Sequence, residues 1–305
     1  MRTVEVGGQT LRVGVRPGKL DGPPLLIFNG IGANLELMEP FTAALNGIEC
    51  VTFDIPGVGG SPAPLLPYRF SGLARLANRV MMQLGYDGEI NVMGVSWGGA
   101  LAQQFAFMYP NRCRRLVLAA TSPGALMVPG RLSVVSKLIS ARRYADPEYL
   151  LKAGANLYGG IFRRQPELLT KHARHIVPPR GRGYLYQLLA GMGWTSLFWL
   201  RLLRQPTLVI GGNDDPIIPL INAKLLALLI RKSRLHVVDD GHLFVVGRAQ
   251  DAARAVSQFL TEEMPGTGPS PQPSPAEAGE GAFIRARGSR RGRDLIPSPR
   301  SRGEG

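Results

Sequence analysis

The chain alternates between short apolar runs and longer stretches in which apolar residues recur every three or four positions. The short runs are bounded by turn residues and are typical of strands buried on both faces of a parallel sheet. They cover residues 25–28, 49–53, 90–95, 116–120, 207–210 and 235–238. The longer stretches predict helices over residues 35–45, 70–84, 98–109, 220–229 and 248–263. Residues 4–15 alternate around Gly7-Gly8 and predict a short hairpin.

This alternation of strands and helices predicts an α/β fold with a mostly parallel central sheet, right-handed crossovers and helices on both faces. Residues 126–204 are the exception, because their pattern is helical and contains no clear strand. We therefore expect a core of residues 1–125 and 205–264, with residues 126–204 inserted as a helical cap. Residues 265–305 hold 7 prolines and 8 glycines, a composition that predicts a disordered tail, with an anchoring arm as the alternative.

Composition limits the class of protein. Of the 305 residues, 45% are hydrophobic, which is enough for a large core and excludes wholesale disorder. No run approaches 18 apolar residues, so we expect no transmembrane segment, and residues 1–15 lack the apolar region of a signal peptide. Cys50 and Cys113 make no disulfide framework, which suits a reducing cytosol, and no Cys/His cluster suggests a metal.

The net charge of +14 is unevenly distributed along the chain. Residues 126–205 hold 13 basic and 3 acidic residues, whereas residues 1–125 hold 10 and 8. A strongly basic protein can bind nucleic acid, but no nucleic-acid-binding motif accompanies these residues. We therefore expect no nucleic-acid partner, and the question becomes what the predicted cap contacts.

The strongest chemical signal is the sequence Gly94-Val95-Ser96-Trp97-Gly98, between a predicted strand and a predicted helix. This is the context of a nucleophile elbow, in which a strained turn projects the serine above the sheet. Small residues are needed two positions away on each side. Ser96 is therefore the candidate nucleophile.

A serine nucleophile needs a general base and an orienting carboxylate. Of the four histidines, His172 and His175 are predicted to lie on a solvated cap helix, and His236 lies inside a strand. His242 follows the last strand, at the sheet edge that also carries the elbow, and is the candidate base. The carboxylate is Asp215 or Asp214; Asp215 is favoured because Pro216 restricts its backbone, and Asp214 suits a turn. The order Ser, Asp, His is that of α/β-hydrolases.

The tetrahedral intermediate of ester hydrolysis needs two hydrogen-bond donors. One is the backbone N–H of Trp97, directly after the nucleophile. The second is expected from the loop of residues 29–34, where glycines let the backbone approach a substrate, and we choose the N–H of Ile31. Asp54 follows another strand and suggests a structural turn, with a second acidic site as the alternative.

At these residues the chain resembles a known family, the intracellular medium-chain-length polyhydroxyalkanoate depolymerases, a branch of the α/β-hydrolases. The resemblance covers roughly residues 2–263 and is carried by residues 28–34, 94–105, 158–160, 193–196, 214–216 and 240–244. Most hydrolases of this fold have His-Gly in the oxyanion loop. This chain has Asn29-Gly30 there, which resembles the sequence in the depolymerase branch.

The resemblance implies a serine esterase that acts on a stored polyester and needs no cofactor. It implies Ser96 as nucleophile, Asp215 as acid and His242 as base, and it makes Asn29 and Trp194 candidates for substrate contacts. The aromatic residues of 194–200, near Arg201 and Arg204, are either an apolar lining or granule-binding patch, or simply the core of the cap.

Two other classes remain open. One is an esterase or C–C hydrolase of the same fold that acts on a small soluble substrate. Release of 3-hydroxy acids from polymer would distinguish a depolymerase from such an enzyme, which would act only on soluble esters. The other is a non-catalytic ligand receptor, against which the complete set of Ser96, Asp215 and His242 argues.

Overall fold

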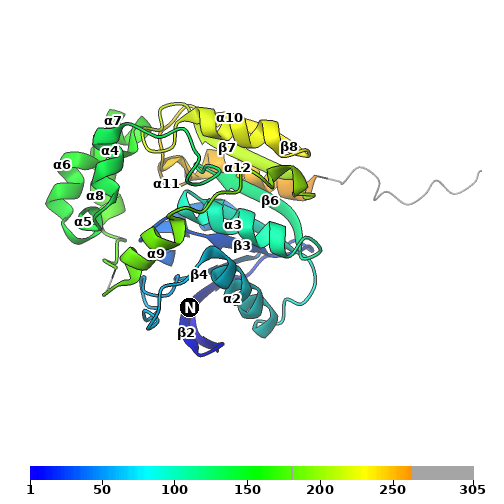
Figure 1. The fold of residues 1–305 in the computed structure, drawn as a ribbon. Helices are drawn as coiled ribbons and strands as arrows, with labels where there is room; N and C mark the ends of the chain where they lie inside the picture. Colours follow the sequence, from blue (N-terminus) through cyan, green and yellow to red (C-terminus); the bar gives the residue numbers. More distant parts are fainter. Residues whose placement is uncertain (180, 263–305) are drawn as a thin grey trace, which may run out of the picture. The chain divides into compact units, whose positions relative to one another are not determined.

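The computed structural model describes residues 1–179 and 181–262, and the predicted tail of residues 265–305 lies outside them. Within the described residues, eight strands form one sheet in the order β1-β2-β4-β3-β5-β6-β7-β8 (Figure 1). The strands are β1 (Arg2–Val6), β2 (Gln9–Arg16), β3 (Leu25–Phe28), β4 (Cys50–Phe53), β5 (Ile90–Val95), β6 (Cys113–Ala119), β7 (Thr207–Gly212) and β8 (Ser233–Val238). The predicted runs therefore become strands of one sheet.

The sheet is parallel from β4 to β8, and β1 and β2 form an antiparallel hairpin at one edge. Helices lie in the connections between the parallel strands, because two parallel strands cannot be joined by a tight hairpin turn. The predicted α/β class with a mostly parallel sheet is confirmed. The last strand, β8, is an exposed edge strand, so the expected burial on both faces is wrong there.

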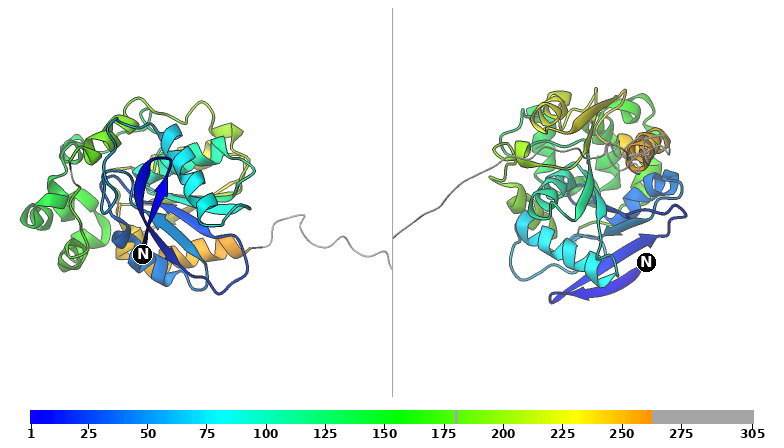
Figure 2. Two further views of the ribbon diagram at one scale, coloured as in Figure 1. Left: turned by 90° about the horizontal axis from the view of Figure 1, so that it is seen from below. Right: turned by 90° about the vertical axis from the view of Figure 1, so that its right-hand side faces the viewer.

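Helices cover both faces of the sheet (Figure 2). The apolar cluster on one face includes side chains of α2 (Phe70–Gln83), α3 (Trp97–Met108) and α10 (Leu220–Leu229). The cluster on the other face includes side chains of α1 (Glu39–Ala44), α11 (Phe244–Gly247) and α12 (Ala249–Thr261). None of the helices within residues 1–179 and 181–262 is long and apolar enough to cross a membrane.

The connection from β6 to β7 contains residues 126–204, which we call the helical insertion. Figure 1 shows α4 to α8 of this insertion as a group beside the sheet. Its elements are α4 (Leu132–Val135), η2 (Ser136–Leu138), α5 (Arg142–Ala145), α6 (Pro147–Tyr158), α7 (Gly160–Arg164), α8 (Glu167–Ala173), α9 (Gly183–Gly191) and η3 (Leu200–Leu202). Its treatment as a separate cap domain stays a prediction.

Two elements differ from their predicted form. The single helix predicted over residues 35–45 is a 3₁₀ turn, η1 (Leu35–Met38), followed by α1 with a proline in its first turn. Proline has no N–H to donate, so it is tolerated where a helix starts. Strand β6 begins three residues earlier than predicted, at Cys113, because Arg115 is buried and donates hydrogen bonds to the backbone carbonyls of Phe259 and Glu262.

Aromatic side chains join the end of the insertion to the core. Phe70 of α2 contacts Trp97 and Trp194, with ring centroids 4.7 and 5.0 Å apart, and the Trp194 and Trp199 rings are 6.0 Å apart. Both tryptophans pack against the cluster under α2 and α3, whereas Phe198 is 80% exposed. Most of this aromatic stretch therefore belongs to the core, and Phe198 is left at the surface.

Candidate active site

Ser96 sits on a sharp turn between β5 and α3. Its backbone has φ 55° and ψ −120°, a left-handed conformation that costs a non-glycine residue about 1–3 kcal/mol. A Cβ on Gly94 would lie 2.2 Å from the carbonyl oxygen of Gly98, and one on Gly98 would lie 2.2 Å from that of Phe28. The turn therefore needs glycine at both positions, as the sequence pattern predicts.

His242 and Asp215 lie in line with this serine. His242 Nε2 is 2.9 Å from Ser96 Oγ, and its Nδ1 is 2.7 Å from Asp215 Oδ2. The N–H groups of Ile217 and Ile218 donate to the other oxygen, Asp215 Oδ1, at 2.9 and 2.8 Å. These bonds fix the carboxylate, and the carboxylate in turn fixes the imidazole ring. The structure thus brings the three predicted side chains into one hydrogen-bonded chain.

Asp214, the alternative carboxylate, points elsewhere. It accepts hydrogen bonds from the N–H of Gly160 at 2.7 Å and from Arg163 at 2.8 Å. Its pKa is lowered by these bonds, which outweigh the opposing effect of partial burial. Asp214 therefore anchors the helical insertion, as its expected place in a turn suggested.

The loop after β3 passes close to Ser96. A Cβ on Gly30 would lie 3.7 Å from the Ser96 Cβ, so the backbone passes directly beside the serine. The N–H of Gly32 donates to Gln187 Oε1 and is already engaged. Within the described residues, the N–H groups of Ile31 and Trp97 donate to no protein acceptor. Both N–H groups therefore remain available to an oxyanion.

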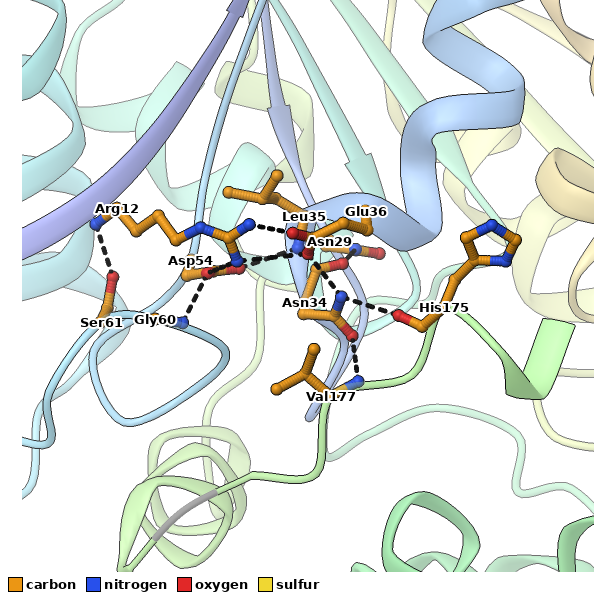
Figure 3. A network of polar contacts seen from close by, with 10 residues as sticks. All are labelled: Arg12, Asn29, Asn34, Leu35, Glu36, Asp54, Gly60, Ser61, His175 and Val177. Atoms are coloured by element: carbon orange, nitrogen blue, oxygen red, sulfur yellow. Dashed lines mark hydrogen bonds and ion pairs between the residues drawn. The ribbon is translucent and has the colours of Figure 1, made fainter. Parts of the chain in front are cut away.

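A polar network holds this loop in shape (Figure 3). Asn29 accepts a hydrogen bond from the N–H of Gly30 and donates one to the carbonyl of Asn34, both at 2.8 Å. Asn34 is fully buried; it donates to the carbonyl of His175 and accepts from the N–H of Val177, both at 3.0 Å. Asn29 thus shapes the loop, and Asn34 joins the loop to the insertion.

Asp54 lies at the base of the same network. It accepts hydrogen bonds from the N–H groups of Leu35 and Gly60, both at 2.8 Å, and forms an ion pair with Arg12 (Figure 3). The carboxylate of Asp54 is thus engaged by backbone N–H groups and by Arg12. This agrees with the expected structural turn and not with a second acidic site.

Ser96 and His242 open into a cavity between the sheet edge and the insertion. Residues of the loop after β3, of the helical insertion and of the segment after His242 line it together. Its lining is largely apolar, and of the predicted residues it includes Asn29, Ile31, Ser96 and His242. The site therefore suits an ester with apolar side chains.

The predicted position of His172 is wrong. Instead of facing solvent it is 6% exposed, packed against the rings of Tyr158 and Phe162. Burial lowers the pKa of His172 to about 4, so the ring is neutral at pH 7. It lines the cavity at Ser96 and also an adjoining cavity that shares Leu37 and Val246, so it forms part of the wall between the two.

Trp194 is not brought to the cavity. Its Nε1 donates to Gln104 Oε1 at 2.9 Å, and its ring packs on Phe70. Among the described residues it does not line the space at Ser96. The apolar pattern around it reflects packing of the insertion onto the core, and the substrate contact expected of Trp194 stays a prediction.

Other residues of the insertion do line the cavity and were not predicted. They are Leu138, Arg143, Tyr144, Tyr158 and His172. Their positions depend on how the short helices fold back over the sheet, which the helical pattern alone does not specify. The run Tyr158-Gly159-Gly160 offered the one available signal, since paired glycines often mark a close backbone approach.

Comparison with known proteins agrees with this geometry. The family model of the alpha/beta hydrolase fold matches residues 23–248. The poly(3-hydroxyalkanoate) depolymerase of Ectopseudomonas oleovorans is 54% identical over 263 residues, which cover 86% of this chain and 93% of the relative. The chain belongs to this depolymerase family of α/β-hydrolases. The family expected from the sequence is thereby confirmed.

Outside the depolymerase family the similarities are weaker. The 3-oxoadipate enol-lactonase 2 of Acinetobacter baylyi is 24% identical, covering 80% of this chain and 90% of the relative. The crystal structure of an enol-lactonase from Burkholderia xenovorans LB400 superimposes with a TM-score of 0.73 at 24% identity, covering 86% of this chain and all of that one. A thermophilic esterase from Thermogutta terrifontis gives 0.71 at 22%, covering 85% and 98%. These structures show the fold alone.

Proposed function

We propose that this chain is a serine hydrolase that cleaves the ester bonds of medium-chain-length poly(3-hydroxyalkanoate) and releases 3-hydroxy acids. The observation that carries the proposal is the hydrogen-bonded chain from Asp215 through His242 to Ser96, opening into an apolar cavity. The depolymerase that is 54% identical supports the polyester as substrate, and the apolar lining suits the hydrocarbon side chains of such a polymer.

The mechanism follows from the geometry. Ser96 Oγ attacks the ester carbonyl while His242 Nε2, 2.9 Å away, accepts its proton. Asp215 holds the imidazole in the orientation and tautomer that this transfer needs. The N–H groups of Ile31 and Trp97 stabilise the oxyanion of the tetrahedral intermediate.

Collapse of this intermediate releases the alcohol, the hydroxyl end of the next polymer unit, which takes the proton from His242. A water molecule, deprotonated by the same histidine, then hydrolyses the acyl-enzyme on Ser96. Each step uses groups of this chain and water, so the mechanism needs no cofactor.

We further propose that the enzyme works in the cytoplasm, on the surface of polyester granules. Two buried thiols, Cys50 and Cys113, suit a reducing compartment. Exposed Phe198 and Leu202, next to Arg201, offer apolar contact and positive charge to a granule surface.

The test is hydrolysis of amorphous polymer granules with long or short side chains, followed by identification of the released acids. The wild type should release 3-hydroxy acids, preferentially from the long-side-chain polymer. Ser96→Ala should lower turnover by roughly 10⁴-fold or more, with an unchanged circular dichroism spectrum. Ser133→Ala, an exposed serine of α4, is the matched control and should behave as wild type.

Two outcomes would contradict the proposal. Hydrolysis retained by Ser96→Ala would rule out this serine as nucleophile. Activity of the wild type on soluble esters but on neither polymer would instead assign a small-substrate esterase of the same fold.

A further inference from the structure

Arg143 is a buried cation at the active-site cavity. It belongs to α5 of the helical insertion, is 3% exposed, and lines the same cavity as Ser96 and His242. A buried guanidinium is costly unless it is paired with an anion. Within the described residues, no Asp or Glu oxygen lies within 4 Å of it, in contrast to Arg163, which is paired with Asp214.

The neighbours of Arg143 are neutral. Its Nη1 donates to the hydroxyl of Tyr184 at 2.9 Å, and the guanidinium lies over the rings of Tyr144 and Tyr184, 4.5 and 5.5 Å from their centroids. Burial raises the pKa of Tyr184, so this phenol stays uncharged at neutral pH. The tyrosines therefore orient the guanidinium without cancelling its charge.

Arg143 also has donors to spare. Its other hydrogen bonds, to the carbonyls of Ser140 and Ile31, are 3.5 and 3.4 Å long, beyond the usual N–H···O range. A guanidinium carries five N–H groups, and a carboxylate can accept two of them in parallel. No acidic side chain is among the described residues that line the cavity. The site thus combines an apolar wall with one unpaired positive charge.

The position of this charge is fixed relative to the reaction centre. The hydroxyl of Tyr144, whose ring lies under the guanidinium, donates to the carbonyl of Ile31 at 2.7 Å, and Nη2 of Arg143 lies 3.4 Å from the same carbonyl. Ile31 belongs to the loop beside Ser96, so the guanidinium lies next to the proposed oxyanion site.

A polyester of 3-hydroxy acids has one anionic group, the carboxylate at its acid end. This end lies on the alcohol side of every ester bond in the chain. We propose that Arg143 binds this terminal carboxylate, so that the enzyme cleaves ester bonds near the acid end and releases short hydroxy acids from it. The inference rests on the proposed function and adds the recognition of one chain end.

The experiment compares two soluble oligomers of a 3-hydroxy acid that differ only at the acid end. One ends in the free carboxylate and the other in a neutral primary amide of nearly the same shape. For the wild type, kcat/KM should be about 10- to 100-fold higher for the carboxylate, the range expected for a charge-assisted bond. In Arg143→Met, kcat/KM for the carboxylate oligomer should fall until the ratio is close to one.

The control is Arg142→Met. Arg142 is the exposed neighbour of Arg143 in α5 and pairs with Asp146, so its loss removes a charge but should keep the wild-type ratio. Arg143→Lys retains the charge without the parallel donors and should keep a reduced preference. A merely structural arginine would lower both oligomers' rates and leave their ratio unchanged.

The wild type alone decides the question if Arg143→Met does not fold. Hydrolysis of a neutral soluble ester should be inhibited by octanoate at concentrations where octanamide has no effect. Equal kcat/KM for the two oligomers, or equal inhibition by octanoate and octanamide, would overturn the role of Arg143 but not the hydrolase. Hydrolysis of neither oligomer would overturn the proposed function, and the inference with it.

Discussion

His172 shows how burial changes the chemistry of a single residue. Its ring is enclosed by Tyr158 and Phe162, and its Nδ1 has no hydrogen-bond partner among the described residues. The folded protein therefore favours the neutral ring, whereas the unfolded chain binds a proton near the ordinary pKa of 6.5. Protonation thus opposes folding.

The stability of the protein should therefore fall in mild acid. The contribution of His172 is complete above pH 6.5 and is lost as the pH falls towards 4, where the folded state also takes up the proton. The shift corresponds to about 3 kcal/mol over this window. Urea unfolding of the wild type and of His172→Phe, measured from pH 7 to pH 4.5, should show a smaller loss for the variant.

His175 supplies the control for this measurement, because it is exposed at the end of the same segment. His175→Phe should keep most of the wild-type pH dependence, because burial is the main cause of the lowered pKa of His172 and the charge of His175 is the smaller one. If the wild type and His172→Phe lose stability in parallel, the acid sensitivity comes from other groups.

At the scale of elements, two chain segments meet backbone to backbone at the turn between α6 and α7. Gly160 has φ 52°, and a Cβ there would lie 1.9 Å from both Asp240 Oδ1 and the N of Gly241. The N–H of His242 donates to the carbonyl of Tyr158 at 2.7 Å in the same contact. The insertion therefore positions the loop that carries the histidine.

Gly160→Ala should disturb this contact. Left-handed strain together with the clash should destabilise the protein by about 3 kcal/mol or more, and displacement of His242 should lower kcat. Thermal unfolding and turnover of a soluble ester would measure the two effects. Gly193→Ala is the matched control, since Gly193 also has a positive φ but open space around it. Equal behaviour of the two variants would show that the close contact is not needed.

The sequence predicts the individual elements of the core, and for the insertion it predicts the helical character but not the separate helices. Strand β5 and the elbow at Ser96 are readable because burial and turn chemistry are local properties. The position of Arg143 is not readable, because it depends on the rings of Tyr144 and Tyr184 and on a loop more than 100 residues away. For His172 the polar neighbours in sequence were misleading, since packing across the insertion decides its burial.

At the scale of the whole molecule, positive charge is concentrated in the insertion. Residues 126–205 hold 13 basic and 3 acidic residues, whereas residues 206–264 hold 6 and 7. Arg201 and Arg204 are exposed beside Phe198. An anionic phospholipid surface on a granule would therefore attract the positively charged insertion. The core, which carries little net charge, would contribute little to this attraction.

Replacing Arg201 and Arg204 by Gln should weaken binding to such granules, by about fivefold per charge at low salt. Because ions screen this attraction, the difference from wild type should vanish near 1 M salt. Co-sedimentation with phospholipid-coated polymer particles would measure it, with turnover of a soluble ester unchanged. The double variant of Arg231 and Lys232, exposed core residues, should bind as wild type, and equal losses in both variants would exclude a specific face.

The chain has three tryptophans, and all three stand at the joint of the insertion with the core: Trp97 directly after Ser96, with Trp194 and Trp199 opposite. Indole emission from this protein therefore comes from one place only. The intrinsic ultraviolet fluorescence of the protein therefore reports on this contact without any added dye. A single signal reflects both the helix that follows the nucleophile and the end of the insertion that returns to the core.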